Sequence, residues 1–263
     1  MPLERPVINS SVPHSARIWN YWLGGKDHYE IDEEVGDQIA SANPEILDIA
    51  VAQRAFLVRA VEYLVGEAGI RQFLDVGTGL PTANNTHEVA QRLVPETRIV
   101  YVDHDPVVLA HAAALLTSTP EGATDYIDAD LRDPEAILEQ AAKTLDFTQP
   151  VALILLGITA HITDDTVYDL VGRLLNALPS GSYLVLCDDT EVLNPQQMRE
   201  MIEQWNAASD NPRINRSPEE LARFFEGLEL LDPGVVSVSQ WRPSQSGEPT
   251  AEVDDFGAVA RKP

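Results

Sequence analysis

The sequence predicts an α/β protein built on a doubly wound, mainly parallel β-sheet. Short apolar runs alternate with helix-period segments along the 263 residues, as they do in consecutive right-handed βαβ units. Several runs are apolar throughout, which is expected of strands covered on both faces. Five runs predict strands, at residues 72–76, 98–103, 124–128, 151–157 and 182–188.

Helix-start signals lie between the predicted strands. Asp133-Pro134 places an N-cap before a proline at the first helical position. The same Asx-Pro arrangement begins helices at residues 44 and 195, and Ser217 with Glu220 forms a capping-box pattern. The alternation of elements therefore continues beyond the fifth strand.

The segment before the first strand predicts helices at residues 17–23, 32–42 and 44 to about 65. We expect residues 1–70 to form a helical extension of the same domain as residues 71–263.

Composition excludes several classes of function. The 18 Lys and Arg against 42 Asp and Glu give a net charge of −24, which repels nucleic acid and anionic membranes. This acidity serves solubility or attracts a cationic acceptor. A single cysteine excludes an intramolecular disulfide, and the longest apolar run, 151–156, is too short to cross a bilayer. Without a secretory signal at the start of the sequence, we expect a cytoplasmic protein.

The first motif follows the first predicted strand and reads Asp75-Val76-Gly77-Thr78-Gly79. Two glycines let the backbone turn tightly and approach a ligand, although a purely structural turn has the same pattern. Asp75 argues against a dinucleotide ligand, because a carboxylate there repels the pyrophosphate of a dinucleotide. S-adenosylmethionine offers an ammonium and a sulfonium instead, so the motif favours this methyl donor.

Two further acidic motifs end the next strands. Asp103 can accept hydrogen bonds from both ribose hydroxyls, whereas Asp105 is better placed to cap the helix that begins at Pro106. At the third strand end, the Asp130 carboxylate and the Leu131 N–H can read the edge of adenine, although four nearby acids also suit a solvated loop. Three acidic strand ends on one rim predict a site for the donor.

His161 follows the fourth predicted strand. A histidine there is suited to accept a proton from an acceptor nucleophile, and a structural histidine bonded to backbone is the alternative. No cluster of His and acidic residues has the spacing of metal ligands, so no metal is expected.

Together these motifs resemble the class I S-adenosylmethionine-dependent methyltransferases. More narrowly, the chain is similar to the bacterial S-adenosyl methyltransferase family first catalogued as a domain of unknown function. The resemblance is carried by the residues at 16–27, 73–82, 234–236 and 240–243.

The resemblance implies a seven-stranded Rossmann-like sheet whose last strand is antiparallel, with a final hairpin around 225–232 and 258–262. It also implies S-adenosylmethionine binding by Asp75, Gly77, Gly79, Asp103 and Asp130. Many methyltransferases have a third glycine where this chain has Pro81, so the turn into the next helix must differ.

The segment 17–27 contains aromatic residues, two cations and a glycine pair. It predicts a lid over the donor, with Arg17 or Lys26 binding the methionine carboxylate. The alternative is a helix that packs Trp19 and Trp22 against the sheet.

The sequence thus favours a methyltransferase with a small-molecule acceptor. A protein that senses S-adenosylmethionine without turnover is the first alternative. A nicotinamide-dependent oxidoreductase is the second, although Asp75 and the missing third glycine count against it.

Overall fold

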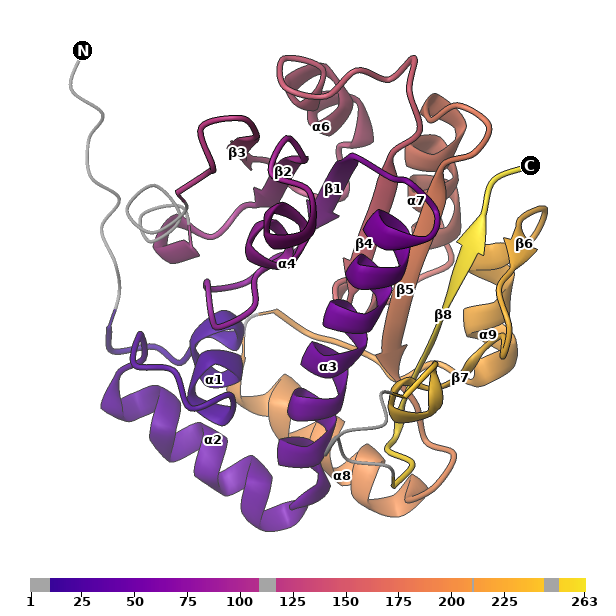
Figure 1. Ribbon diagram of the computed structural model, residues 1–263. Helices are drawn as coiled ribbons and strands as arrows, with labels where there is room; N and C mark the ends of the chain where they lie inside the picture. The colour runs from indigo at the N-terminus through magenta and orange to yellow at the C-terminus, as the bar shows by residue number, and fades with distance from the viewer. Residues whose placement is uncertain (1–9, 109–116, 210, 244–250) are drawn as a thin grey trace.

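The computed structural model describes residues 10–108, 117–209, 211–243 and 251–263 (Figure 1). In these residues one sheet of eight strands runs in the order β3-β2-β1-β4-β5-β8-β6, and β7 pairs with β8. The strands are β1 (Gln72–Val76), β2 (Arg98–Asp103), β3 (Ala123–Asp128), β4 (Ala152–Leu156), β5 (Tyr183–Asp189), β6 (Glu229–Leu230), β7 (Val236–Ser237) and β8 (Asp255–Arg261). The five predicted strands therefore form within one residue of their predicted bounds.

The sheet is doubly wound. Strands β1 to β5 pair in parallel, and β8 runs antiparallel to β5, β6 and β7. From β1 the chain adds β2 and β3 on one side, and then returns to add β4 and β5 on the other. The order therefore reverses between β1 and β4, where folds of this class bind ligands. The predicted fold class is confirmed.

The final hairpin differs in detail from the expected one. Within the expected hairpin segment 225–232 only β6 forms, and a further short strand, β7, follows that segment, so the described sheet has eight strands rather than seven. Pro233 has no N–H to continue a ladder, and Gly234 has a φ of 90°. These two residues separate β6 from β7.

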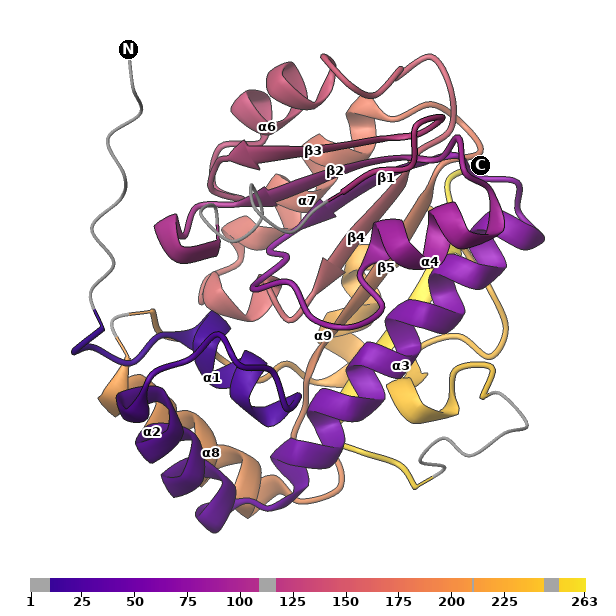
Figure 2. The same cartoon turned by 60° about the vertical axis from the view of Figure 1, so that its left-hand side comes forward.

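Helices cover both faces of the sheet (Figure 2). The described α-helices are α1 (Ser15–Trp22), α2 (Glu30–Ala42), α3 (Glu45–Gly66), α4 (Thr86–Leu93), α6 (Pro134–Ala141), α7 (Thr166–Ala177), α8 (Pro195–Ala208) and α9 (Pro218–Ala222). Short 3₁₀ helices are η1 (Thr159–His161), η2 (Arg223–Phe225) and η3 (Val238–Gln240).

Alternate residues of the central strands enter two separate apolar cores. Phe73 of β1 packs in the core beneath α3 and α4, and its neighbour Leu74 packs in the core beneath α6 and α7. Both side chains are fully buried. Because successive strand residues point to opposite faces, continuous apolar strands need this double cover.

The predicted helix starts are largely confirmed. The Asp133 carboxylate accepts from the N–H of Ala136 at 3.1 Å, and Ser217 and Glu220 form the reciprocal bonds of a capping box. Asn194 differs, because its side chain does not cap α8 and instead donates to Glu45.

The three N-terminal helices form as predicted, and α1 and α2 lie with α8 near the carboxyl ends of the parallel strands (Figure 2). Trp22 of α1 packs 6.3 Å from Trp205 of α8, ring centre to ring centre. Ile18 and Trp22 belong to the same apolar core as strand residue Phe73. Residues 1–9 of the predicted extension lie outside the described residues. None of the described helices combines the length and apolar character that a membrane span requires.

Candidate functional site

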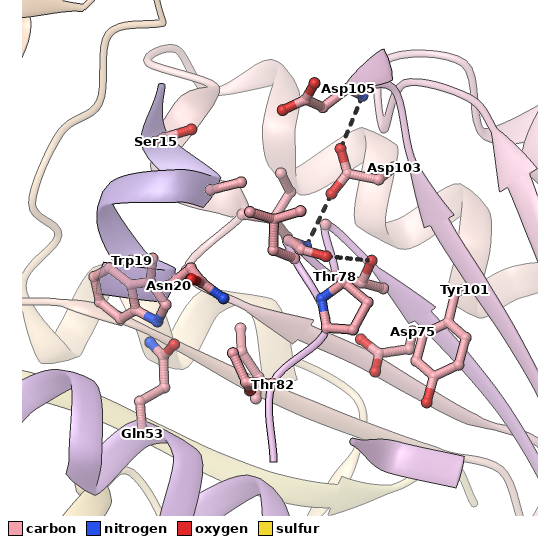
Figure 3. A pocket seen from close by; sticks show the side chains of 18 of the residues that line it. Ser15, Trp19, Asn20, Gln53, Asp75, Thr78, Thr82, Tyr101, Asp103 and Asp105 are labelled. Atoms are coloured by element: carbon pink, nitrogen blue, oxygen red, sulfur yellow. Dashed lines mark hydrogen bonds between the residues drawn. The ribbon is translucent and has the colours of Figure 1, made fainter. Parts of the chain in front are cut away.

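A pocket opens at the carboxyl ends of β1, β2 and β4, at the point where strand order reverses. One side, called here the loop wall, consists of the loop 77–82 after β1 and residues 103–105 after β2. The other side, the helix wall, consists of Trp19, Asn20, Gln53, His161, Trp205 and Arg213. Figure 3 shows Trp19, Asn20 and Gln53 across the pocket from Asp75 and Tyr101.

The two glycines of the loop wall meet a steric requirement. Gly77 has a φ of 76° and Gly79 a φ of 62°, both in the left-handed region that glycine tolerates best. A Cβ at Gly77 would lie 2.5 Å from Cβ of Ile158. The Gly77 position therefore needs glycine for both its conformation and its space.

Asp103 holds the loop wall together. Its Oδ2 accepts from the N–H of Gly79 at 2.9 Å, and its Oδ1 accepts from the N–H of Asp105 at 3.0 Å (Figure 3). Asp105 accepts from the N–H of Val107 at 2.8 Å, which is the capping role expected for it. Burial raises the pKa of Asp103 above its ordinary value. Asp103 thus lies at the pocket, separate from the helix cap.

Asp75 is buried at the floor of the loop wall. Its Oδ2 accepts from Oγ1 of Thr86 at 2.6 Å. Burial raises its pKa to about 6, and the bond from Thr86 and the charge of Arg54 act in the opposite direction. Near neutral pH the carboxylate is therefore mainly ionised within a desolvated pocket.

Arg54 of α3 also lines the pocket, and the sequence prediction missed it. Its Nη2 donates to Oγ1 of Thr82 in the loop wall. Burial lowers its pKa, yet a guanidinium remains charged in proteins. The available signal was the polar pair Gln53-Arg54 within a helix that is otherwise largely apolar.

The residues predicted to read adenine line a smaller adjoining recess. Asp130 and Leu131 lie there, and Gly77, Asp103 and Ile158 line both the recess and the pocket. Oδ1 of Asp130 accepts from the N–H of Arg132 at 2.8 Å, so the loop is ordered by its own carboxylate. Asp75 and Asp103 thus line the pocket, and Asp103 and Asp130 line the recess, so Asp103 is common to both.

Arg17 and Lys26 do not line the pocket. Arg17 is buried, and its Nε lies 2.7 Å from Oδ2 of Asp32 in α2. Lys26 is exposed. The helix predicted as a lid contributes Trp19, among other residues, to the helix wall instead of a cation. Arg17 thus anchors α1 to α2, and the movement of this segment remains a prediction.

His161 lies in the helix wall with its imidazole against protein groups. Its Nδ1 donates to the backbone oxygen of Pro212 at 3.2 Å, since a carbonyl can only accept. Burial and the charge of Arg213 lower its pKa to about 3. A base with so low a pKa is poorly matched to proton abstraction near neutral pH. The geometry therefore favours the structural alternative over the catalytic one.

The remaining helix-wall groups are aromatic and cationic. Nη2 of Arg213 lies 2.6 Å from Oδ2 of Asp189, and its guanidinium stacks over Trp205 at 5.2 Å. Sequence reasoning had no signal for either residue, because the packing of α8 on α1 and α2 brings them to the pocket. Among the described residues, no group of three or more His, Cys, Asp or Glu is arranged to hold a metal ion.

Comparison with known proteins identifies a family that this chain resembles over nearly its whole length. The model of the family described as S-adenosyl methyltransferase matches residues 2–263. A search of the curated proteins found no match.

Solved structures also resemble this chain over nearly its whole length. A DUF574 family protein from Streptomyces avermitilis MA-4680 is 45% identical, with a TM-score of 0.92 over 97% of this chain and 99% of that one. A proposed methyltransferase from Thermobifida fusca YX is 39% identical, with a TM-score of 0.87 and 96% of each chain covered. An S-adenosylmethionine-dependent methyltransferase from Anabaena variabilis ATCC 29413 shares the fold, with a TM-score of 0.55 at 14% identity over 100% of this chain and 99% of that one.

Proposed function

The chain belongs to the S-adenosyl methyltransferase family, and from this we propose that its pocket transfers a methyl group to a small-molecule acceptor. S-adenosylmethionine is the methyl donor of the family, and when bound it supplies a methyl group on a positively charged sulfur. In our proposal the loop wall binds the donor and the helix wall receives the acceptor.

The chemistry of the loop wall fits this donor. One observation carries the assignment: Asp103 ends β2, the strand beside β1, and lines the pocket at the switch point, where its carboxylate can accept from both ribose hydroxyls. Gly77 and Gly79 let the chain approach the methionine portion closely. The Asp130 carboxylate and the Leu131 N–H are assigned to adenine in the adjoining recess.

Charge distribution supports the placement of the methionine end. The ionised Asp75 carboxylate favours a neighbouring ammonium or sulfonium, and Arg54 is the nearby cation for the methionine carboxylate. Arg54 thereby takes the role expected of Arg17 or Lys26. The pyrophosphate of a nicotinamide dinucleotide would lie beside Asp75, where like charges repel.

Turnover distinguishes a methyltransferase from a sensor of S-adenosylmethionine. We expect the purified protein to convert S-adenosylmethionine to S-adenosylhomocysteine when small-molecule fractions of a bacterial extract are added. We also expect calorimetry to detect S-adenosylhomocysteine binding and no NAD⁺ binding. Donor binding without turnover in any fraction would support the sensor, and tight NAD⁺ binding would support the oxidoreductase.

The pKa of Asp75 predicts how donor binding depends on pH. Because the folded pKa is raised to about 6, the carboxylate is protonated at lower pH and no longer attracts the donor cation. Binding must then displace a proton, so affinity should fall by up to about tenfold for each pH unit below 6. Calorimetry between about pH 5 and pH 8 measures this slope, because this range covers both sides of the Asp75 titration.

The Asp75→Asn variant is the matched control, because its side chain does not titrate. Its affinity should be weaker at pH 8 and should change less between about pH 6 and pH 5 than that of the unmodified protein. Parallel pH profiles for the two proteins would exclude Asp75 as the titrating group.

A further inference from the structure

The helix wall combines aromatic surface with a buried cation. Three of the four tryptophans of the chain gather here. Trp19 and Trp205 line the pocket, while Trp22 lies behind them, 5.5 Å from Trp19 and 6.3 Å from Trp205 between ring centres. Trp19 comes from α1 and Trp205 from α8, so the two indoles approach the pocket from different helices. Such a wall favours a flat, apolar ligand.

Arg213 provides a polar anchor within this surface. Its side chain is 4% exposed and lines the pocket, and one guanidinium nitrogen, Nη2, pairs with Asp189. Its buried Nε has no hydrogen-bond partner among the described residues. A buried donor left without a partner is unfavourable, so a small rotation of the Arg213 side chain that brings Nε to a ligand oxygen in the pocket would be favourable.

The charges around Arg213 determine which kind of ligand oxygen is favoured there. Asp189 offsets part of the Arg213 charge, and Asp188 pairs with Arg216 at 3.3 Å. Asp255 accepts a hydrogen bond from Nε2 of Gln53 at 2.9 Å, and burial raises its pKa well above the ordinary value. The helix wall itself contains no carboxylate, in contrast to the loop wall. An anionic group on the acceptor therefore meets Arg213 without a facing negative charge in this wall.

We infer that the acceptor is a planar aromatic carboxylic acid, held by Arg213 between Trp19 and Trp205 and methylated on its carboxylate oxygen. This inference rests on the proposed function. The acceptor carboxylate oxygen forms a bond to the methyl carbon as the carbon–sulfur bond breaks, and the bonding pair moves to sulfur. The products are a methyl ester and S-adenosylhomocysteine, and no proton is released.

The absence of a suitable base in the helix wall agrees with this chemistry. A hydroxyl acceptor must lose a proton, and His161 is the titratable partner on this side, with a pKa lowered to about 3. A carboxylate is already ionised near neutral pH and needs no base. A protonated amine would be repelled by Arg213 and by the donor sulfonium.

Binding of matched probes tests the anion site. With the protein saturated by S-adenosylhomocysteine, we expect 2-naphthoate to bind about 10- to 100-fold more tightly than 2-naphthamide, as for a hydrogen bond to a charged group. Trp19→Leu should weaken both probes, because both use the aromatic wall. Equal affinity for acid and amide in the unmodified protein would overturn the inference.

A paired variant keeps the test valid if Arg213 is needed for folding. Arg213→Gln combined with Asp189→Asn replaces the buried ion pair by two amides of similar size, so no buried charge is left alone. We expect this variant to bind S-adenosylhomocysteine normally and to lose the preference for naphthoate. Retention of that preference would exclude Arg213 as the anchor.

The product identifies the methylated atom. With tritiated S-adenosylmethionine and the acidic organic fraction of a bacterial extract, we expect label that hydroxide releases as volatile methanol. A labelled product that hydroxide does not cleave would contradict the inference. Failure to label any organic acid in the fraction would also contradict it. If S-adenosylhomocysteine itself does not bind, the proposed function fails instead, so the two failures are distinguishable.

Discussion

Replacing Asp32 by alanine is expected to lower the free energy of unfolding by about 3–5 kcal/mol, the range for breaking a buried ion pair. Asp32 is fully buried, and its carboxylate accepts from Nε of Arg17 at 2.7 Å. It also accepts from the backbone N–H of His14 at 2.9 Å and of Tyr29 at 2.8 Å. Alanine leaves the Arg17 cation and two N–H groups without these partners.

Glu62→Ala is the matched control, because it also removes a helical carboxylate that pairs with arginine. Glu62 lies 3.3 Å from Arg92, and both side chains are about half exposed, at 46% and 53%. Exposed pairs contribute only about 0–1 kcal/mol. Urea denaturation measures both losses, and similar losses for the two variants would contradict the anchoring role of Asp32. Because Trp19 lies on the helix that Arg17 anchors, aromatic ligands should also bind Asp32→Ala more weakly.

Asp103→Ala is expected to weaken S-adenosylhomocysteine binding about 10- to 100-fold, as for the loss of hydrogen bonds to a charged group. Two effects combine, because the ribose loses its acceptor and the N–H of Gly79 loses the bond that shapes the loop wall. The fold should persist, since the side chain is only partly buried and lies outside both large apolar cores.

Asp128→Ala controls for the removal of one negative charge from the same edge of the sheet. Asp128 pairs with Asp103 in the strand register of β2 and β3, but it is exposed and does not line the pocket. Calorimetry should give nearly unchanged affinity for this variant. If both variants bind alike, Asp103 acts only as a general surface charge or loop acid.

Much of the fold was predictable because its signals are local. Apolar runs such as 151–157 and cap pairs such as Asp133-Pro134 depend on neighbouring residues. The acidic strand ends Asp75, Asp103 and Asp130 were also predictable as one rim, because parallel strands end at the same edge of a sheet.

Other residues of the pocket were not predictable in the same way. Trp205 and Arg213 of the helix wall reach the pocket through the packing of the segment from α8 onward, which no local pattern specifies. Arg54 was missed although the polar pair Gln53-Arg54 in α3 was a signal. Arg17 illustrates the converse. Its sequence neighbours suggested a cation that binds the ligand. In the structure, Arg17 instead forms a buried ion pair with Asp32 of the next helix.

The central claim is that the loop wall binds S-adenosylmethionine through Asp103 at the carboxyl end of β2. Diffraction from crystals grown with S-adenosylhomocysteine tests it most directly, because electron density locates the ligand. The account predicts ribose hydroxyls within hydrogen-bond distance of the Asp103 carboxylate, adenine in the recess at Asp130, and sulfur facing the helix wall. Density for the ligand at any other place, with the Asp103 carboxylate not in contact with the ribose, would contradict it.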